Sequence, residues 1–192
     1  MENKFLAHIA EDGREQTVFE HLAAEFSRPF GGEAQGLLAG TAHDIGKYSA
    51  AFQRRLTGDS RRVDHATAGA FECMGRGQPF AAFAVAGHHG GLPDGGGRGD
   101  GPEAATFWGR LKRAGRGGLE PYGAWAREVS LPGGQPPPFA KQNPGAGMFF
   151  IRMLYSCLVA ADFLDTEDFM SGKPRGSCSG CWKKKAPSIR PL

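Results

Sequence analysis

Cysteine is scarce in this sequence, with four residues among 192. Cys73 and Cys157 fall within apolar helical patterns, and Cys178 and Cys181 have no second pair with which to complete a structural metal site. This usage does not suit the disulfide framework of a small secreted domain. The first ten residues contain no apolar run long enough for a signal peptide. We therefore expect a cytoplasmic protein in a reducing compartment.

Long hydrophobic runs are also scarce. The apolar run over residues 148–161 is interrupted by Arg152, and it is shorter than the ~20 residues that a helix needs to cross a bilayer. No stretch alternates apolar and polar residues for long enough to predict a β-strand. The sequence therefore predicts neither a membrane span nor a sheet.

The composition favours one domain with much loop. Hydrophobic residues make up 40% of the chain, and glycine (30) and proline (13) are abundant. A chain of this length can form one core and is short for two. The net charge of +3 permits an anionic partner without requiring one. No acid follows Asp168, so we expect a domain over residues 1–170 and a basic tail or truncated linker over 171–192.

Apolar residues recur at helical spacing along most of the chain. The pattern predicts helices over residues 17–26, 33–48, 65–73, 79–89 and 148–165, with shorter helices over 51–56 and 102–114. Asp64 is a good N-cap for the third of these helices. Glycine and proline dominate much of residues 94–147, which indicates a loop-rich insertion. The expected fold is all-α, a helical bundle with an irregular insertion.

The most informative stretch is residues 39–47, which read Ala-Gly-Thr-Ala-His-Asp-Ile-Gly-Lys. On a helix, the buried face would hold Leu38, Thr41, Ala42 and Ile45. A different face would carry Gly40 together with His43, Asp44 and Lys47. An imidazole, a carboxylate and an ammonium group would then lie together. This grouping indicates a functional site only if other parts of the chain supply further ligands.

Further candidate ligands occur at helical positions that face packed surfaces. The complete set is His21, His43, Asp44, His65, His88, His89 and Asp162. An aspartate such as Asp162, on the continuation of a buried face, is costly unless a cation neutralises it. Imidazoles with carboxylates suit Mn, Fe, Ni, Co or Zn ions better than Mg or Ca alone. Seven ligands suit two divalent ions that share a bridge, and Asp44 has the two oxygens that a bridge needs.

These residues resemble the HD metal-dependent phosphohydrolase superfamily. Four segments are more specific, and they read Gly-Leu-Leu-Ala-Gly-Thr-Ala-His-Asp-Ile-Gly-Lys-Tyr (36–48), Val-Asp-His-Ala-Thr-Ala-Gly (63–69), Ala-Gly-His-His-Gly-Gly-Leu (86–92) and Ala-Asp-Phe-Leu-Asp-Thr-Glu (161–167). They are similar to the HD nuclease domain of the type I CRISPR-associated helicase-nuclease. The resemblance covers roughly residues 5–170 and thins over 94–147.

The resemblance implies a two-metal nuclease that hydrolyses phosphodiester bonds of single-stranded DNA in CRISPR interference, an antiviral defence. One implied ion is held by His21, His43, Asp44 and Asp162, and the other by Asp44, His65, His88 and His89. Lys47 would add a cation where negative charge grows in the transition state. The implied metals are of the Mn, Fe, Ni or Co type, with Mg possible, and the implied partners are a helicase module and an RNA-guided surveillance complex. The chain has no P-loop motif, so the helicase would be a separate polypeptide or the chain a fragment.

Other residues have a functional and a simpler interpretation. His8 competes with His21 as the first ligand, and we expect it to support the site without binding an ion. Ser156 would do the same, or would bond within its own helix. Lys47 lies near a helix end, where any lysine is favourable. A basic group near Phe107 and Trp108 would line a channel for nucleic acid or form a solvated helix face; it comprises Arg98, Arg110, Lys112, Arg113 and Arg116.

Two other functions remain open. An HD-family phosphohydrolase for nucleotides or cyclic dinucleotides would use the same metals, but it needs a closed pocket that reads the base. A regulatory module with a vestigial site would act by protein contact alone. The complete ligand set speaks against the second of these.

Overall fold

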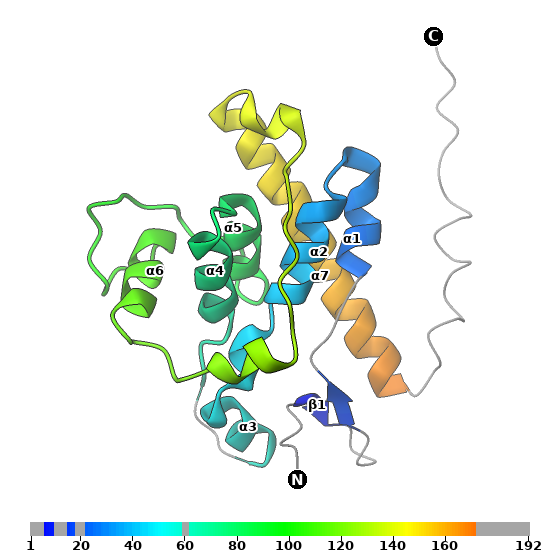
Figure 1. The fold of residues 1–192 in the computed structure, drawn as a ribbon, viewed down its shortest axis with the longest axis vertical. Helices are drawn as coiled ribbons and strands as arrows, with labels where there is room; N and C mark the ends of the chain where they lie inside the picture. Colours follow the sequence, from blue (N-terminus) through cyan, green and yellow to red (C-terminus); the bar gives the residue numbers. More distant parts are fainter. Residues whose placement is uncertain (1–5, 10–14, 18–21, 59–61, 172–192) are drawn as a thin grey trace.

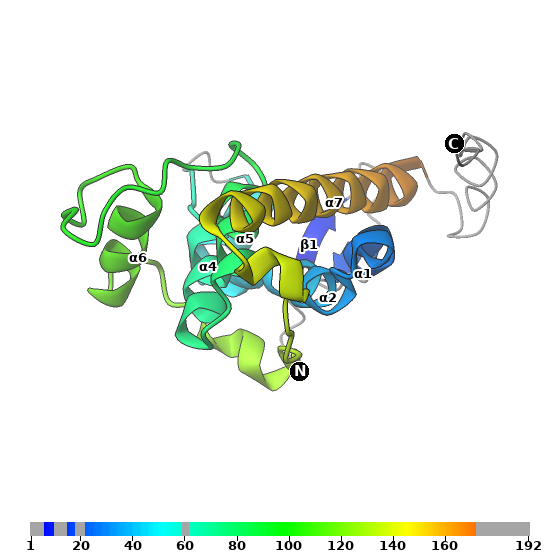
Figure 2. The same ribbon diagram turned by 90° about the horizontal axis from the view of Figure 1, so that it is seen from above.

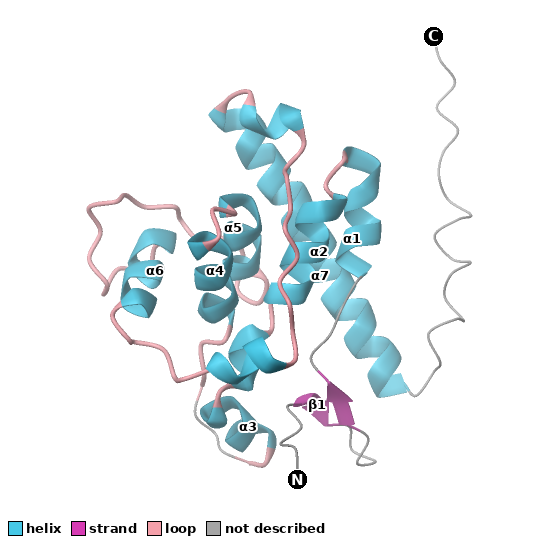
Figure 3. Ribbon diagram, viewed as in Figure 1, coloured by secondary structure: helices cyan, strands magenta, loops and turns pink. Residues whose placement is uncertain are grey.

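The computed structural model describes residues 6–9, 15–17, 22–58 and 62–171, and helices make up most of this part of the chain (Figures 1 and 3). The helices are α1 (Leu22–Ser27), α2 (Glu33–Ala42), α3 (Ala50–Leu56), α4 (Ala66–Gly75), α5 (Pro79–Gly87), α6 (Phe107–Gly115) and α7 (Pro144–Ser171). Short 3-10 helices occur at η1 (Arg28–Phe30), η2 (Ile45–Tyr48), η3 (Gly123–Arg127) and η4 (Pro138–Lys141). The prediction of a helical domain is confirmed. The tail expected beyond Ser171, with Cys178 and Cys181, lies outside the described residues.

Two short strands near the N-terminus differ from the expectation of helices alone. Strands β1 (Leu6–Ile9) and β2 (Glu15–Thr17) pair antiparallel, with Leu6 opposite Thr17 and Ile9 opposite Glu15. Strands of three or four residues are too short to show a clear alternation of apolar and polar residues, so the sequence did not predict them. The helix expected over 17–26 is observed only from Leu22, and residues 18–21 lie outside the described part.

Helix α7 is the longest element, and helices on both sides of the Asp44 segment in sequence pack against it. It runs along much of the molecule, with α1, α2 and α5 against it (Figures 1 and 2). Asn143 caps its start, because the side chain accepts a hydrogen bond from the amide of Ala146 at 2.9 Å. Of the four residues predicted for its buried face, Ile151, Leu154 and Leu158 are buried and Tyr155 is half-buried. Helix α7 thus begins earlier and ends later than predicted.

The outer face of α7 carries exposed apolar side chains: Met148, Phe149, Met153, Phe163 and Met170. Within α7, the stretch Pro144–Glu167 (24 residues) is long and apolar enough to cross a membrane by length and composition alone. This stretch extends beyond the apolar run of residues 148–161 on which the expectation was based. The core helix of a soluble protein passes the same test, so the expected absence of a membrane span stays a prediction.

The segment 94–147 is more ordered than its composition suggests. It contains α6, η3 and η4, and it contributes Phe107, Trp125 and Val129 to the core. Hydrogen bonds from two buried side chains hold it in place. The Gln35 amide, fully buried in α2, donates to the Gly134 carbonyl at 2.7 Å, and the Tyr48 hydroxyl donates to Glu128 at 2.9 Å. The segment is therefore part of the domain core.

Two glycines allow α4 to approach the end of α2 closely. A Cβ atom on Gly69 would lie 2.0 Å from the carbonyl oxygen of Ala42, and one on Gly46 would lie 2.3 Å from the carbonyl oxygen of His65. No side chain fits in either place. This close approach brings the residues after α2 against the start of α4.

We predict that Gly69→Ala lowers the free energy of unfolding by about 1–3 kcal/mol, because the added methyl group must displace backbone. Gly75→Ala in the same helix is the matched control, since a Cβ there meets nothing within 4 Å. The control should be neutral or gain up to about 1 kcal/mol. Urea unfolding followed by circular dichroism measures both values, and equal stability of the two variants would contradict the close approach.

Candidate metal centre

The candidate ligands that the structure describes lie mainly at helix ends. The helix predicted over 33–48 is broken, because α2 ends at Ala42 and Asp44 has φ −102° and ψ 8° before η2 begins. His65 directly precedes α4, and His88 and His89 directly follow α5. The residues of both predicted faces of the 33–48 segment are buried, and His43, Asp44 and Lys47 lie together as expected. The ends of α2, α4 and α5 converge at one place.

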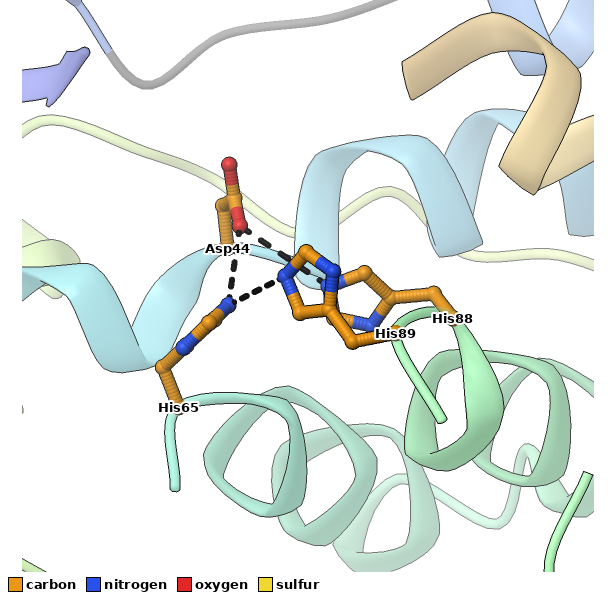
Figure 4. A group of neighbouring side chains, drawn as sticks. All are labelled: Asp44, His65, His88 and His89. Atoms are coloured by element: carbon orange, nitrogen blue, oxygen red, sulfur yellow. Dashed lines mark hydrogen bonds and ion pairs between the residues drawn. The ribbon is translucent and has the colours of Figure 1, made fainter. Parts of the chain in front are cut away.

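Four side chains form what we term the Asp44 cluster: Asp44, His65, His88 and His89 (Figure 4). Each offers one ligand atom, and these atoms lie within 4.8 Å of one another. Asp44 Oδ1 is 3.7 Å from His65 Nε2 and 4.0 Å from His88 Nε2, while His65 Nε2 is 2.7 Å from His89 Nε2. His89 is exposed and the other three are buried. The cluster is thus accessible from one side.

The second carboxylate oxygen of Asp44 faces a different group of side chains. Asp44 Oδ2 lies 2.7 Å from Lys47 Nζ and 3.3 Å from His43 Nε2. His43 Nε2 is also 3.7 Å from Asp162 Oδ1, which comes from α7. Asp44 therefore lies between two sets of charged and imidazole groups, one at each oxygen.

Backbone carbonyls orient two of the imidazoles. His43 Nδ1 lies 2.6 Å from the Gly40 carbonyl oxygen, and His88 Nδ1 lies 2.7 Å from that of Val85. A carbonyl can only accept, so both Nδ1 atoms carry the hydrogen. In the neutral ring, Nε2 then has its lone pair available on the side of Asp44. This is the arrangement that metal-binding histidines usually adopt.

The charge states follow from burial and from neighbouring charges. Burial lowers the pKa of His65 to about 4 and that of His88 to about 3, so both rings are neutral at pH 7. Burial opposes charge on Asp44 as well, but His43 and Lys47 hold its pKa well below the usual value. At His43, burial would lower the pKa, but the neighbouring carboxylates of Asp44 and Asp162 have the larger combined effect and raise the pKa well above the usual value. The Asp44 cluster thus combines a carboxylate with neutral imidazoles.

The Asp44 cluster fits a divalent metal ion. Asp44 Oδ1 and His88 Nε2 are buried and have no hydrogen-bond partner in the described part of the chain. Buried polar atoms rarely lack a partner, and a metal ion would satisfy both of these. Imidazole and carboxylate donors suit transition metals. The cluster could therefore hold a metal ion.

Most of the predicted ligands lie at or beside Asp44. The predicted roles of His21, His8 and Ser156 stay predictions. Six of the seven ligands lie in the Asp44 cluster or beside it, but His21 lies outside the described residues. His8 belongs to β1, and its side chain also lies outside the described part. The exposed Ser156 hydroxyl donates to the Arg152 carbonyl at 2.9 Å. This is the bond within its own helix, so a supporting role for Ser156 stays a prediction.

Most of the basic residues predicted to bind nucleic acid donate hydrogen bonds to other groups of the protein. Arg110 donates to Thr67 and Ala86, Lys112 donates to the carbonyls of Arg98 and Asp100, and Arg113 donates to the Pro102 carbonyl. The Arg98 guanidinium lies 5.7 Å from the ring centre of Trp108. Arg116 is exposed. The role of this group in binding nucleic acid stays a prediction.

Phe52 has a role at the site that the sequence pattern did not reveal. Its ring centre lies 5.1 Å from that of His65 and 5.6 Å from Lys47 Nζ. The side chain of the next residue, Gln53, donates to the Lys47 carbonyl at 2.8 Å. Helix α3 therefore supports both His65 and Lys47. The sequence signal for this position is the pair Phe52-Gln53 itself, which follows closely after the segment 36–48 and shares its resemblance to the HD nuclease domain.

We predict that the metal-free protein loses stability as the pH falls from about 6.5 to 4. His65 has a pKa of about 4 when folded against an ordinary value of 6.5, so the unfolded chain binds the proton more readily in this range. His65→Gln removes this contribution, which amounts to about 3 kcal/mol at 1.36 kcal/mol per pKa unit. The free energy of unfolding of His65→Gln should therefore fall less steeply than that of the wild type as the pH is lowered.

Urea unfolding in the presence of a chelator, repeated at several pH values, measures this difference. Ser130→Ala is the control, because it changes an exposed hydroxyl outside the site and should keep the wild-type pH dependence. If His65→Gln and the wild type lose stability in parallel, His65 is not held neutral by burial.

Comparison with known proteins assigns no family to this site. The sequence matches no protein-family model, and no curated protein matches it. The resemblance to HD nucleases therefore rests on the residues themselves. The function has to be argued from the Asp44 cluster and its surroundings.

Proposed function

We propose that this protein is a metal-dependent phosphohydrolase of the nuclease type, which hydrolyses phosphodiester bonds in single-stranded DNA. The observation that carries the proposal is the position of Asp44, whose two carboxylate oxygens face two different sets of candidate ligands. The substrate is proposed from the resemblance of the surrounding segments to HD nucleases. A role in CRISPR interference in the cytoplasm, with a helicase module and an RNA-guided complex as partners, rests on that resemblance alone.

Two divalent ions would share Asp44 in the proposed centre. His65, His88 and His89 would hold one together with Asp44 Oδ1, and His43 and Asp162 would hold the other together with Oδ2. His21 is the proposed remaining ligand of the second ion. Bound at this position, such ions supply Lewis acidity at the phosphate and lower the pKa of a water molecule.

The side chains of the protein have separate proposed tasks. Burial keeps His65 and His88 neutral, so their lone pairs remain available to ligate. Lys47 is itself buried, and its ammonium group offsets part of the charge of Asp44 at 2.7 Å. Because Lys47 is held beside the candidate ligands, its charge would also favour the negative charge that develops on the phosphate in the transition state.

The cleft beside the Asp44 cluster favours a polymer over a free nucleotide. It has a volume of about 330 Å³, and His65, His89 and Arg110 contribute to its lining. The remaining lining residues are Val63, Asp64, Ala66, Ala86, Gly90, Gly91, Leu92 and Pro93. None of these described lining residues is a phenylalanine, tyrosine or tryptophan on which a base could stack. A substrate recognised through its backbone suits such a cleft better than one recognised through its base.

We predict that the protein binds close to two Mn²⁺ ions per chain and nicks circular single-stranded DNA when Mn²⁺ is supplied. Asp44→Asn keeps the shape of the side chain but removes the charge that both ions share, so cleavage should fall by more than about 100-fold. Elemental analysis and a gel-based nicking assay measure the two quantities. Asp94→Asn, on an exposed loop residue, is the matched control and should behave like the wild type.

The alternatives give different results in the same assays. Hydrolysis of nucleoside triphosphates or cyclic dinucleotides without cleavage of DNA would favour the nucleotide phosphohydrolase. Absence of bound metal, with no cleavage in Mn, Ni, Co or Mg, would favour the regulatory module. Unchanged cleavage by Asp44→Asn would exclude the bridging role of Asp44.

A further inference from the structure

Arg110 of α6 connects the two chain segments that supply the histidines of the Asp44 cluster. Its Nη1 donates to the Ala86 carbonyl at 2.7 Å, and its Nε donates to the Thr67 hydroxyl oxygen at 2.9 Å. Ala86 precedes His88 by two residues, and Thr67 follows His65 by two residues. One guanidinium group therefore bonds close to both sources of histidine.

The groups that accept from Arg110 are available because they belong to helix ends. Helix α5 ends at Gly87, so the Ala86 carbonyl is one of the last four, which lack a donor within the helix. At the start of α4, Asp64 accepts from the Thr67 amide at 3.1 Å and from the Thr67 hydroxyl at 2.7 Å. Arg110 Nη2 lies 3.4 Å from the same Asp64 carboxylate.

This connection joins the two segments whose relative position sets the spacing of the candidate ligands. His65 and His89 belong to different segments, and the 2.7 Å between their Nε2 atoms depends on how the start of α4 lies against the end of α5. A planar guanidinium has five donors in a fixed fork and can bond both segments at once, which a lysine ammonium on a flexible stem does far less specifically.

We propose that Arg110 is a positioning residue for the metal centre, which holds His65 at the correct distance from the His88–His89 pair. This inference rests on the proposed function, and it names a determinant of metal affinity in that site. It also replaces the predicted role of Arg110 as a contact for nucleic acid. The guanidinium bonds to acceptors of the protein itself, the side chain is 18% exposed, and Asp64 offsets its charge.

Arg110→Met and Arg110→Lys test the inference, with Co²⁺ as the probe. Both variants should bind Co²⁺ about tenfold or more weakly than the wild type, because neither restores the fork. The visible absorption of bound Co²⁺, which reports its coordination, should also change. Titrations are made well below the melting temperature of each variant, so that a loss of overall stability does not enter the comparison.

Arg113→Met is the matched control. It removes the same charge from the same helix, but Arg113 reaches Asp64 only at 3.8 Å and otherwise donates to the Pro102 carbonyl. Its Co²⁺ affinity and spectrum should match the wild type. If Arg110→Met lowers the melting temperature yet binds Co²⁺ normally, Arg110 only stabilises the packing and the inference is wrong.

A second measurement needs no metal and therefore separates this inference from the proposed function. In the metal-free protein, the ring protons of His65 and His89 should show a through-space NMR contact. This contact should be retained in Arg113→Met and lost in Arg110→Met. Its persistence in Arg110→Met would overturn the positioning role. A wild type that shows the contact but binds no Co²⁺ would count against the metal centre and not against Arg110.

Discussion

The burial of the Asp44 carboxylate is the constraint on which the surrounding structure depends. A carboxylate removed from water is costly unless cations or donors surround it. Lys47 and His43 meet one oxygen, while the other faces His65 and His88 with no hydrogen bond in the described part of the chain. Three helices end within reach of this group. Gly69 allows the start of α4 to lie close to the end of α2, because a side chain at this position would clash with the Ala42 carbonyl group.

The sequence predicted the ligands better than the elements that carry them. Asp162 followed from continuing the buried ladder of α7 beyond Leu158, and the structure places its carboxylate 3.7 Å from His43. The pair His88–His89 stood out because it ends an otherwise apolar helix. Both predictions depended on recognising a helix from its apolar residues, which is reliable when the helix is long or strongly apolar.

What could not be predicted depends on contacts between distant residues. Apolar periodicity continues past Ala42, so nothing local indicates that α2 ends there and that Asp44 leaves the helical conformation. That break is tied to the close contact between Gly46 and His65, which are 19 positions apart. Arg110 looked like a surface charge because its acceptors, Thr67 and Ala86, lie far away in the sequence.

The hydrogen bonds that anchor the segment 94–147 limit how far this segment can be shortened. The Tyr48–Glu128 and Gln35–Gly134 hydrogen bonds tie the segment to η2 and α2, the elements on either side of His43 and Asp44. Trp125 and Val129 fill core space beside them. Shortening this stretch to a tight turn would remove the Gly134 acceptor of the buried Gln35 amide and would take Trp125 and Val129 out of the core. Homologous chains that lack it must therefore rebuild that wall of the domain with other residues.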